Sequence, residues 1–361
     1  ERWRMNDLLA GKGRDIFLRM RQDDAVQAAL DLIVSGVLSR AWRLEVDDED
    51  SRREDAAEVL TYLLKNRLRG SIAGLVTAML TARAEGFAPI EKVYGATTYG
   101  GKPYWCLRGY KLRNPASFTV VNDVHGNLLE VKQQTDSGKT IVVEPRRFVW
   151  YVHRPEVDPD FGGSDLVAAY PQWWGKRNVL NLWNVYIERV AGGFIAIQSR
   201  QADGGKVPAA LTAKTMGDFQ QIVTNWQQTM GVVLPQGWEA VVTVPGATTA
   251  FNDRVTSANM SIARALLQPN LLGFAEQGAH GSLAQAGSQF DTWTLVLDRL
   301  CDQVADCLNE QLLRELCVWN FGADLEPPVL CFDPLDAAKR QALAAAWALA
   351  VEKGAVVNTF E

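Results

Sequence analysis

The chain has 361 residues, of which 47% are hydrophobic and 22% are charged, with a formal net charge of −5. These proportions are those of a globular protein with a sizeable core, and they exclude an intrinsically disordered chain. Basic residues never follow one another for more than two positions. The sequence therefore lacks the basic runs expected of a protein that binds nucleic acid tightly and nonspecifically.

Five cysteines form an odd set that contains no CxxC pair. We therefore expect free thiols in a reducing compartment, and neither a disulfide framework nor a zinc site. No uncharged apolar run reaches the roughly 18 residues that a membrane-spanning helix needs. The sequence starts at Glu1 without a signal-peptide pattern, which leaves truncation of either terminus open.

The first quarter of the chain is expected to be helical. Helical periodicity covers residues 1–45 with a polar break near Gly11–Gly13, and an acidic turn follows at Asp47–Asp55. Two further helices are predicted over residues 56–68 and 71–85.

From residue 87 the pattern changes to the two-residue alternation of β-strands. Turn-forming Gly, Pro, Asn and Asp separate six strand candidates, which are residues 90–94, 104–110, 118–121, 128–132, 140–143 and 148–153. Because no helix alternates with these strands, the pattern predicts an antiparallel meander and not a nucleotide-binding α/β fold.

The longest regular stretch, Phe161–Ile197, predicts a helix far longer than the average of about 11–12 residues. Ser164-Asp165 has the residue types that cap a helix start, and Gly192-Gly193 predicts its end. Pro171 removes a backbone donor inside the stretch, so we expect it to kink or divide the helix.

A small strand–helix–strand module is predicted between this helix and a second long helix over residues 251–267. Its members are strands near residues 194–198, 232–234 and 241–244 and a helix over residues 216–230. Residues 271–289 then form a loop rich in Gly, Ala, Gln and Ser, and loops of this length are usually functional or disordered.

The last part of the chain is again expected to be mainly helical. Apolar residues alternate three- and four-residue steps from Phe290, which predicts a long helix with a heptad-like seam. A strand is expected at residues 329–332, and an Ala-rich helix from Asp333 to Gly354.

No pattern in the sequence predicts a catalytic, cofactor or metal site. The three histidines, His125, His153 and His280, are scattered and have no second ligand at metal-binding spacing. Residues 95–103 resemble a phosphate loop only loosely, and a hairpin turn explains them better. The acidic run at residues 47–55 lacks the ligand spacing of a calcium loop, so a solvated turn is expected there.

Five motifs, taken in order, resemble the Mu-like portal family of tailed bacteriophages over roughly residues 20–320. They are Arg147–Arg154 (RFVWYVHR), Phe161–Leu166 (FGGSDL), Tyr170–Asn178 (YPQWWGKRN), Val233–Glu239 (VLPQGWE) and Ile262–Leu267 (IARALL). Each motif is moderately specific, and their order and spacing carry the resemblance.

The resemblance implies an α+β portal fold with a helical and β-rich wing, two stem helices, a small α/β clip, a tunnel loop and a helical crown. The implied parts are residues 1–160 (wing), 161–194 (first stem helix), 195–250 (clip), 251–268 (second stem helix), 269–289 (tunnel loop) and 290–361 (wing and crown helices).

The implied function is that of a portal, or head–tail connector, and involves no enzyme activity, cofactor or membrane. Twelve copies would form a ring at one capsid vertex of the virion, assembled in the host cytoplasm, through which double-stranded DNA is packaged and ejected. The implied partners are the major capsid protein, the terminase large subunit and head–tail adaptor proteins.

The family's parts assign candidate residues to this sequence in three groups. The DNA-facing loop residues are Glu276, Gln277, His280, Ser282, Gln285, Ser288 and Gln289; the stem residues are Trp173, Lys176, Arg177, Trp183, Arg254 and Arg264; and the clip residues that contact a partner are Lys206, Lys214 and Trp226. The loop lacks the family's Gln-Thr-Leu-Thr start, so the residues that touch DNA stay open. Residues 251–290 have balanced charges, as a conduit that must not grip DNA requires.

Two other classes of function stay open. The acidic residues Asp47, Asp48, Glu49 and Asp50 would suit a metal-dependent nucleic-acid-processing enzyme, which a magnesium-dependent cleavage assay would reveal. A virion adaptor without a channel shares the composition, but it does not predict a Gly-rich loop between two long helices. The alternative for that loop is a disordered surface connection.

Overall fold

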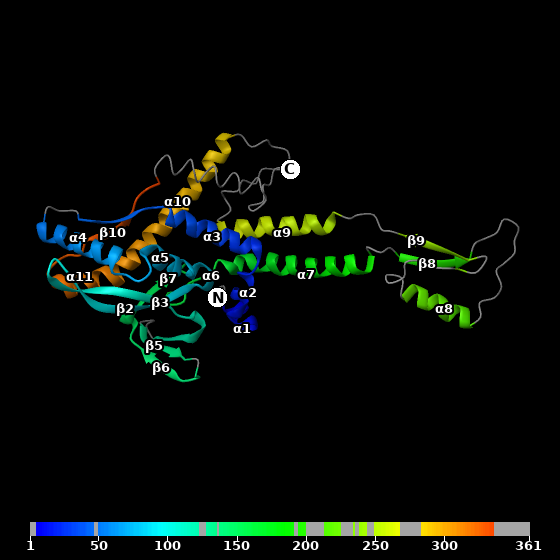
Figure 1. Cartoon of the computed structure of the whole chain (residues 1–361), viewed down its shortest axis with the longest axis horizontal. Coiled ribbons are helices and arrows are strands. Elements are labelled where there is room, and N and C mark those ends of the chain that lie inside the picture. Colours follow the sequence, from blue (N-terminus) through cyan, green and yellow to red (C-terminus); the bar gives the residue numbers. More distant parts are fainter. Residues whose placement is uncertain are drawn as a thin grey trace. The chain divides into compact units, whose positions relative to one another are not determined.

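The structure is a computed structural model that describes residues 5–46, 50–122, 128–135, 137–190, 194–199, 213–224, 234, 238–243, 249–267 and 283–335. Contacts divide the chain into two compact units (Figure 1). We call Glu1–Trp173 together with Asn259–Glu361 the body, and Trp174–Ala258 the arm. The division falls inside helices α7 (Leu166–Val190) and α9 (Ala250–Leu267), which both contribute to the two units.

The N-terminal part of the body is helical, with the break near Gly11–Gly13 that the sequence predicts. Its helices are α1 (Met5–Lys12), α2 (Asp15–Met20), α3 (Asp24–Leu38), α4 (Ser51–Asn66), α5 (Ile72–Leu80) and α6 (Ala82–Glu85). Asp23, Asp50 and Ser71 cap α3, α4 and α5, because each side chain accepts a hydrogen bond from a backbone N–H in the first turn.

Residues 42–45 correct the prediction of helix up to residue 45. They form β1 (Trp42–Glu45), which pairs antiparallel with β10 (Val329–Phe332). The partner strand comes from the far end of the described chain, so the local periodicity could not indicate it. The Ala-rich helix predicted up to Gly354 lies outside the described residues from residue 336 onward.

All six strand candidates between residues 87 and 153 are confirmed, but they form two three-stranded sheets instead of one meander. The strands are β2 (Phe87–Tyr99), β3 (Lys102–Leu112), β4 (Phe118–Asn122), β5 (Leu128–Gln134), β6 (Thr140–Val143) and β7 (Phe148–Val152), with short 3₁₀ turns η1 (Pro115–Ser117) and η2 (Pro145–Arg147). The sheet orders are β3-β2-β7 and β4-β5-β6. β7 returns to pair with β2, and this long-range pairing separates the sheets.

The long helix of the last part begins earlier than predicted. α10 runs from Leu283 to Leu308, so the predicted loop over residues 269–289 is wrong for its last seven positions. Leu283, Ala284 and Gln285 favour a helix and outweigh the turn signal of Gly287. α10 continues into the π-helical segment η5 (Asn309–Leu313) and then into α11 (Arg314–Phe321).

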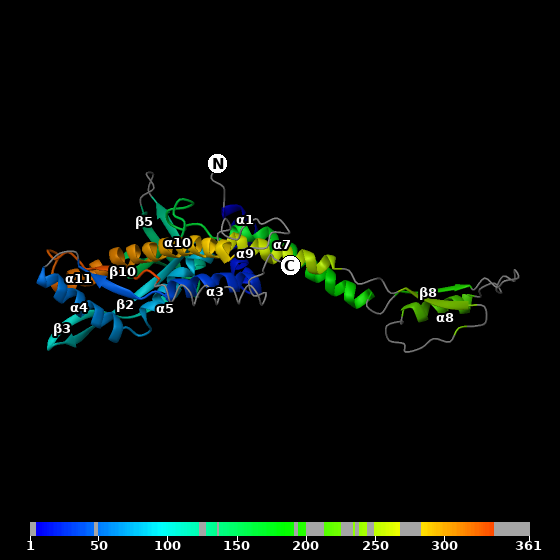
Figure 2. The same ribbon diagram turned by 90° about the horizontal axis from the view of Figure 1, so that it is seen from above.

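The predicted heptad seam of α10 is confirmed as its core-facing side. Leu297, Leu300 and Val304 are buried, and α10 lies next to α3 (Figure 1, Figure 2). Gly36 of α3 permits this contact, since a Cβ there would lie 2.7 Å from Cδ1 of Leu297. A side chain at residue 36 would push the two helices apart.

Amide side chains from η5 and α11 hydrogen-bond the backbone of three strands. The Asn309 amide accepts from the N–H of Leu330 in β10 (2.7 Å) and donates to its C=O (3.1 Å). The Gln311 amide accepts from the N–H of Trp150 in β7 (2.7 Å) and donates to its C=O (3.2 Å). Asn320 does the same for β3. Unpaired strand edges are open to other chains, so these amides protect three positions of the body from unwanted pairing.

The predicted strand–helix–strand module is confirmed in outline within the arm. β8 (Phe194–Ser199) pairs antiparallel with β9 (Trp238–Thr243), and α8 (Ala213–Thr224) packs on them through Phe219, whose ring centroid lies 5.1 Å from that of Trp238. The strand predicted at residues 232–234 lies outside the described residues except for Leu234, which belongs to no strand.

Candidate functional site at the start of helix α7

The chain enters α7 through a tight turn that only glycine permits. Gly162 has φ of +61°, and a Cβ there would lie 2.1 Å from the carbonyl oxygen of His153 and 2.3 Å from that of Gly86. The two carbonyls are close together here because the backbone N–H of His153 donates a hydrogen bond to the carbonyl of Gly86 (2.8 Å). The next residues, Ser164 and Asp165, are thereby placed in the interior, with Asp165 only 1% exposed.

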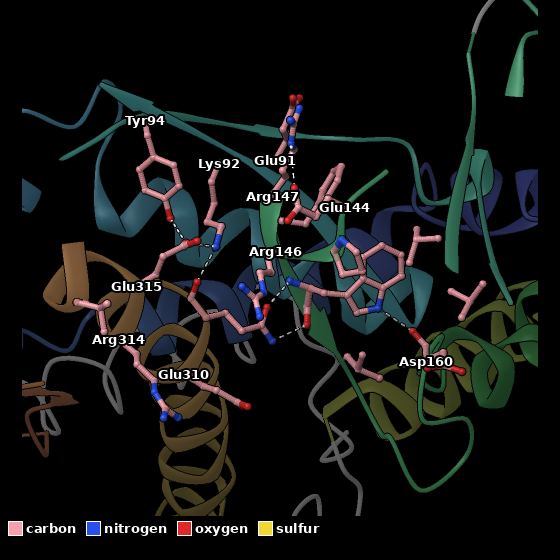
Figure 3. A pocket seen from close by; sticks show the side chains of 18 of the residues that line it. Glu91, Lys92, Tyr94, Glu144, Arg146, Arg147, Asp160, Glu310, Arg314 and Glu315 are labelled. Carbon is pink, nitrogen blue, oxygen red and sulfur yellow. Dashed lines mark hydrogen bonds and ion pairs between the residues drawn. The ribbon is translucent and has the colours of Figure 1, made fainter. Parts of the chain in front are cut away.

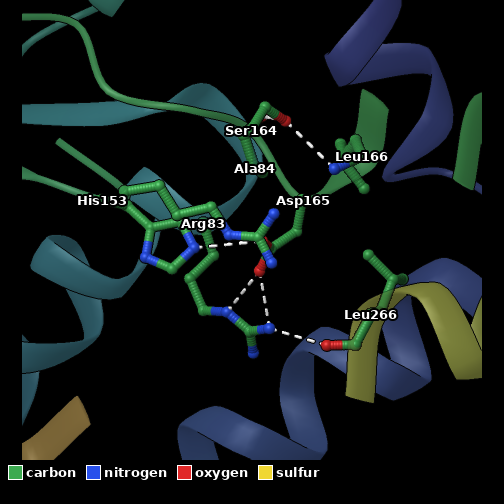
Figure 4. A network of polar contacts seen from close by, with 8 residues as sticks. Arg83, Ala84, His153, Ser164, Asp165, Leu166 and Leu266 are labelled. Carbon is green, nitrogen blue, oxygen red and sulfur yellow. Dashed lines mark hydrogen bonds and ion pairs between the residues drawn. The ribbon is translucent and has the colours of Figure 1, made fainter. Parts of the chain in front are cut away.

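Asp165 is the centre of a buried charge network (Figure 4). Arg83 of α6 lies 2.6 Å from it through Nη2 and donates through Nε at 2.8 Å. His153 lies 3.1 Å away through Nε2, and the Nε of Arg154 lies 3.0 Å away. Arg154 has φ of +53°, so the local backbone is strained to aim this side chain.

The surroundings keep Asp165 ionised. Burial alone would raise its pKa, but the charge of Arg83, the hydrogen bond from His153 and the charge of Arg154 outweigh burial and lower the pKa to about 2. The carboxylate is therefore charged at neutral pH and fully partnered.

Arg83 also links the network to the end of the second long helix. Its Nη2 donates to the backbone carbonyl of Leu266 at 2.7 Å, in the last turn of α9 (Figure 4). One guanidinium thus holds α6, the start of α7 and the end of α9 together. We call this network the Asp165 junction.

Sequence reasoning found the junction only in part. Ser164 accepts from the Leu166 N–H at 3.1 Å, as a cap would, but Asp165 is an ion-pair centre and not a cap. His153 is structural, as expected. The sequence analysis did not predict a role for Arg83. A single cation within the apolar run of α5 and α6 could have indicated a buried ion pair.

Pro171 was expected to kink or divide the helix, and a division does not occur, because α7 is one continuous helix from Leu166 to Val190. Pro171 lies in the second turn, where its missing N–H removes a single intrahelical bond.

The stem candidates lie in different environments. Trp173 and Lys176 are each 4% exposed, whereas Arg177 is exposed. Trp183 is half-buried in the arm and stacks on Phe251 of α9, with 6.0 Å between ring centroids and 5° between planes.

The remaining candidates are the two stem arginines of α9, the loop residues and the clip residues. Arg254 and Arg264 are half-buried on α9, and the Arg254 guanidinium would lie 2.8 Å from a Cβ at Gly175. Glu276, Gln277, His280, Ser282, Lys206 and Trp226 lie outside the described residues, Gln285, Ser288 and Gln289 lie in α10, and Lys214 is exposed in α8.

A groove of about 1160 Å³ lies between β2, β7, the β4–β6 sheet and η5–α11 (Figure 3). Several of its charged residues are paired inside the body: Glu315 contacts Lys92 at 2.6 Å and accepts from the Tyr94 hydroxyl, and Glu91 holds Arg113. Arg146, Glu310 and Arg314 also line the groove and form no ion pair with the described residues. Burial and then Glu315 raise the pKa of Tyr94. The groove therefore offers satisfied structural pairs where a catalytic site would hold a poised acid or base.

Thiols and possible metal ligands give no catalytic arrangement in the described part of the chain. Burial raises the pKa of Cys301 to about 11 and that of Cys307 to about 12, which makes both poor nucleophiles. No group of three or more His, Cys, Asp or Glu in the described ranges could hold a metal ion. Within those ranges, no helix has the length and apolarity needed to cross a membrane.

Comparison with solved structures shows which known proteins share this fold. Among solved structures, "Virion of native gene transfer agent (GTA) particle" has a TM-score of 0.59 and 17% identity, covering 97% of this chain and 91% of that chain. "Neck of native GTA particle computed with C12 symmetry" has a TM-score of 0.59 and 15% identity, covering 98% and 91%. The fold is therefore the α+β fold found in those particles.

The family comparison is more specific. The model described as "Portal protein of Mu bacteriophage" matches residues 14–360. The chain belongs to this portal family, and the resemblance seen in the sequence motifs is confirmed. A search of curated proteins gave no match.

Proposed function

We propose that the chain is the subunit of a closed ring of about twelve copies at one vertex of a virion, through which double-stranded DNA is packaged and ejected. Membership of the portal family supports the role. The twelve-fold symmetry named for a structure of the same fold supports the copy number. In a ring of twelve, the formal charge is 12 × −5 = −60, which keeps DNA from adhering to the walls.

The observation that carries the proposal is an apolar surface on the arm half of α7. Leu182 is 61% exposed, Trp174 47% and Val185 42%, and helical spacing places these three on a different side from Trp183, which packs on α9. Large apolar side chains grouped on one helix mark an interaction surface. Neighbouring copies in a ring would cover this surface.

The parts of the ring follow the expected division of the chain. We assign the body to the wing and crown, α7 and α9 to the stem, β8, α8 and β9 to the clip, and residues 269–282 to the tunnel loop. The clip and wing would meet the head–tail adaptor, the terminase large subunit and the major capsid protein. The role is structural and not enzymatic, since portal proteins form a channel and leave DNA translocation to a separate motor.

Cryo-electron microscopy of particles that contain this chain tests the proposal. We expect a closed ring at a single vertex, with the α7 surface buried between copies and DNA density on the axis. Absence of the chain from every vertex, or its presence as isolated copies without a channel, would favour an adaptor. Magnesium-dependent DNA cleavage by the purified chain would favour an enzyme.

A further inference from the structure

A basic pocket of about 530 Å³ lies on the β2–β3 hairpin, and portal membership does not by itself explain it. Nine residues line the pocket, and its charged members are Arg69, Arg108 and Lys111, with no Asp or Glu among the nine. Within the described ranges none of the three cations forms an ion pair. The nearest carboxylate across the strands, Glu91 opposite Lys111, is held by Arg113 instead.

The backbone is shaped to bring these cations together. The register of the hairpin shifts between Val93 and Tyr94, which leaves Arg108 as the extra residue of a β-bulge. Bulges re-aim side chains and are frequent next to functional sites. The Arg69 N–H donates to the freed carbonyl of Arg108 at 2.9 Å, which fixes the α4–α5 loop beside the bulge.

Glycine leaves room for the Arg108 side chain. A Cβ at Gly95 would lie 2.6 Å from the Cγ of Arg108, so a larger residue would displace the arginine. The pocket therefore has a fixed backbone, a cleared space and a net positive charge. Such a site fits a partner that presents carboxylates or phosphates.

The same body carries a row of three carboxylates along one helix, bounded by the exposed cations Arg299 and Arg314. Asp302, Asp306 and Glu310 follow one another at four-residue steps along α10 and η5, and all three are exposed. Residues four apart lie on one helix face. No ion pair involves these carboxylates in the described residues.

Within one copy, no ion pair joins this acidic surface to the basic pocket in the described part of the chain. Lys92 points toward η5 and Glu315 (Figure 3), whereas its neighbour Val93 lines the basic pocket. A closed ring joins two different surfaces of each copy, and oppositely charged surfaces would set its direction.

We propose that the basic pocket of Arg69, Arg108 and Lys111 receives the acidic face of Asp302, Asp306 and Glu310 from the next copy in the ring. This inference rests on the proposed ring. The contact sets which side of each copy meets the next, and it makes ring formation dependent on salt, because exposed charges are screened over roughly 8–10 Å at physiological ionic strength.

Charge reversal and charge exchange test the contact, with native mass spectrometry and melting curves as readouts. We expect the double variant Arg69→Glu with Lys111→Glu to need at least about ten-fold more protein to form rings, since facing like charges repel. Asp302→Lys with Asp306→Lys should have the same defect. Combining all four substitutions should restore rings, because the exchanged charges again attract.

A matched control separates this contact from a general effect of charge. Arg19→Glu with Lys139→Glu also changes the net charge by −4, from −5 to −9, at exposed positions outside the pocket. This control should form rings as the parent chain does. Glutamine at residues 69 and 111 gives a milder pocket variant, with a smaller expected loss.

Several results would overturn the inference. Normal rings from the pocket double variant would show that the contact is unnecessary, and failure of the fourfold variant to restore rings would show that the partner surface is wrong. Normal rings together with lost salt-dependent binding of double-stranded DNA would make the pocket a phosphate site. Absence of rings from the parent chain would instead refute the proposed function itself.

Discussion

The start of α7, in the body, and its later turns, in the arm, hold their side chains in different environments. In the body, Asp165 is 1% exposed and has Arg83, His153 and Arg154 as partners. In the arm, large apolar residues such as Leu182 stay 61% exposed on the surface of α7. The Asp165 junction is completed within one chain, whereas we propose that further copies cover the apolar surface of the arm. The same helix, α7, begins in the first condition and ends in the second.

Removing the central carboxylate of the body should have the largest effect. Asp165→Ala would leave Arg83 buried without its partner, which costs about 3–5 kcal/mol of the free energy of unfolding. Urea denaturation followed by tryptophan fluorescence measures this loss. Asp302→Ala, at an exposed carboxylate, is the control and should change stability by less than about 0.5 kcal/mol. Equal effects of the two substitutions would show that the Asp165 junction does not hold the body together.

Truncating the aromatic contact inside the arm should cost less. A buried Trp→Ala substitution loses about 3–5 kcal/mol, but Trp183 is only half-buried against Phe251, so Trp183→Ala should lose about 2 kcal/mol. Thermal melting of the isolated subunit gives the value. A change near zero would mean that the α7–α9 stack forms only in the assembled ring, which would sharpen the contrast with the body.

Low pH should lower the free energy of unfolding of the body, because Asp165 becomes protonated. The pKa of Asp165 is about 2 in the folded chain and 3.8 as its ordinary value. Its contribution of about 2 kcal/mol is fully present above pH 4 or so and is lost as the pH falls toward 2, because the unfolded chain takes up the proton first. The difference in stability between the parent chain and Asp165→Asn, measured from pH 6 to pH 2, should shrink accordingly. A constant difference across that range would contradict the assigned pKa.

The smallest effect on the subunit should come from the exposed surface of α7. Leu182→Ser removes an apolar side chain that is 61% exposed, so the stability of the isolated subunit should change by less than about 0.5 kcal/mol. Ring formation should nevertheless weaken, since the apolar surface shrinks. Asn184→Ser, at an exposed polar position of the same helix, is the control for the mass measurement. If both variants form rings equally well, the α7 surface is not a contact between copies.

Local patterns predicted much of the fold. The strands between residues 87 and 153, the two long helices and the small module in the arm all follow from periodicity and turn residues. The patterns could not show that β1 pairs with β10 or that β7 returns to β2, because strand pairing depends on residues distant in sequence. They also placed the start of α10 too late, because residues 283–289 share the Gly, Ala, Gln and Ser composition of the residues before them.

The candidate site was harder to predict than the fold. Ser164 and Asp165 were noticed as a helix start, but the role of Asp165 depends on Arg83 and His153, which lie 82 and 12 residues away in the sequence. The bulge at Arg108 depends on a register shift that no local motif encodes. Family resemblance supplied the portal role, which composition and periodicity alone did not.

The central claim is that the arm is completed by further copies of the chain. The mass of the purified parent chain at micromolar concentration, measured by native mass spectrometry, tests this claim most directly. We expect one closed species near twelve times the subunit mass of 39.9 kDa. A strict monomer at that concentration, with the apolar surface of α7 still open to solvent, would contradict it.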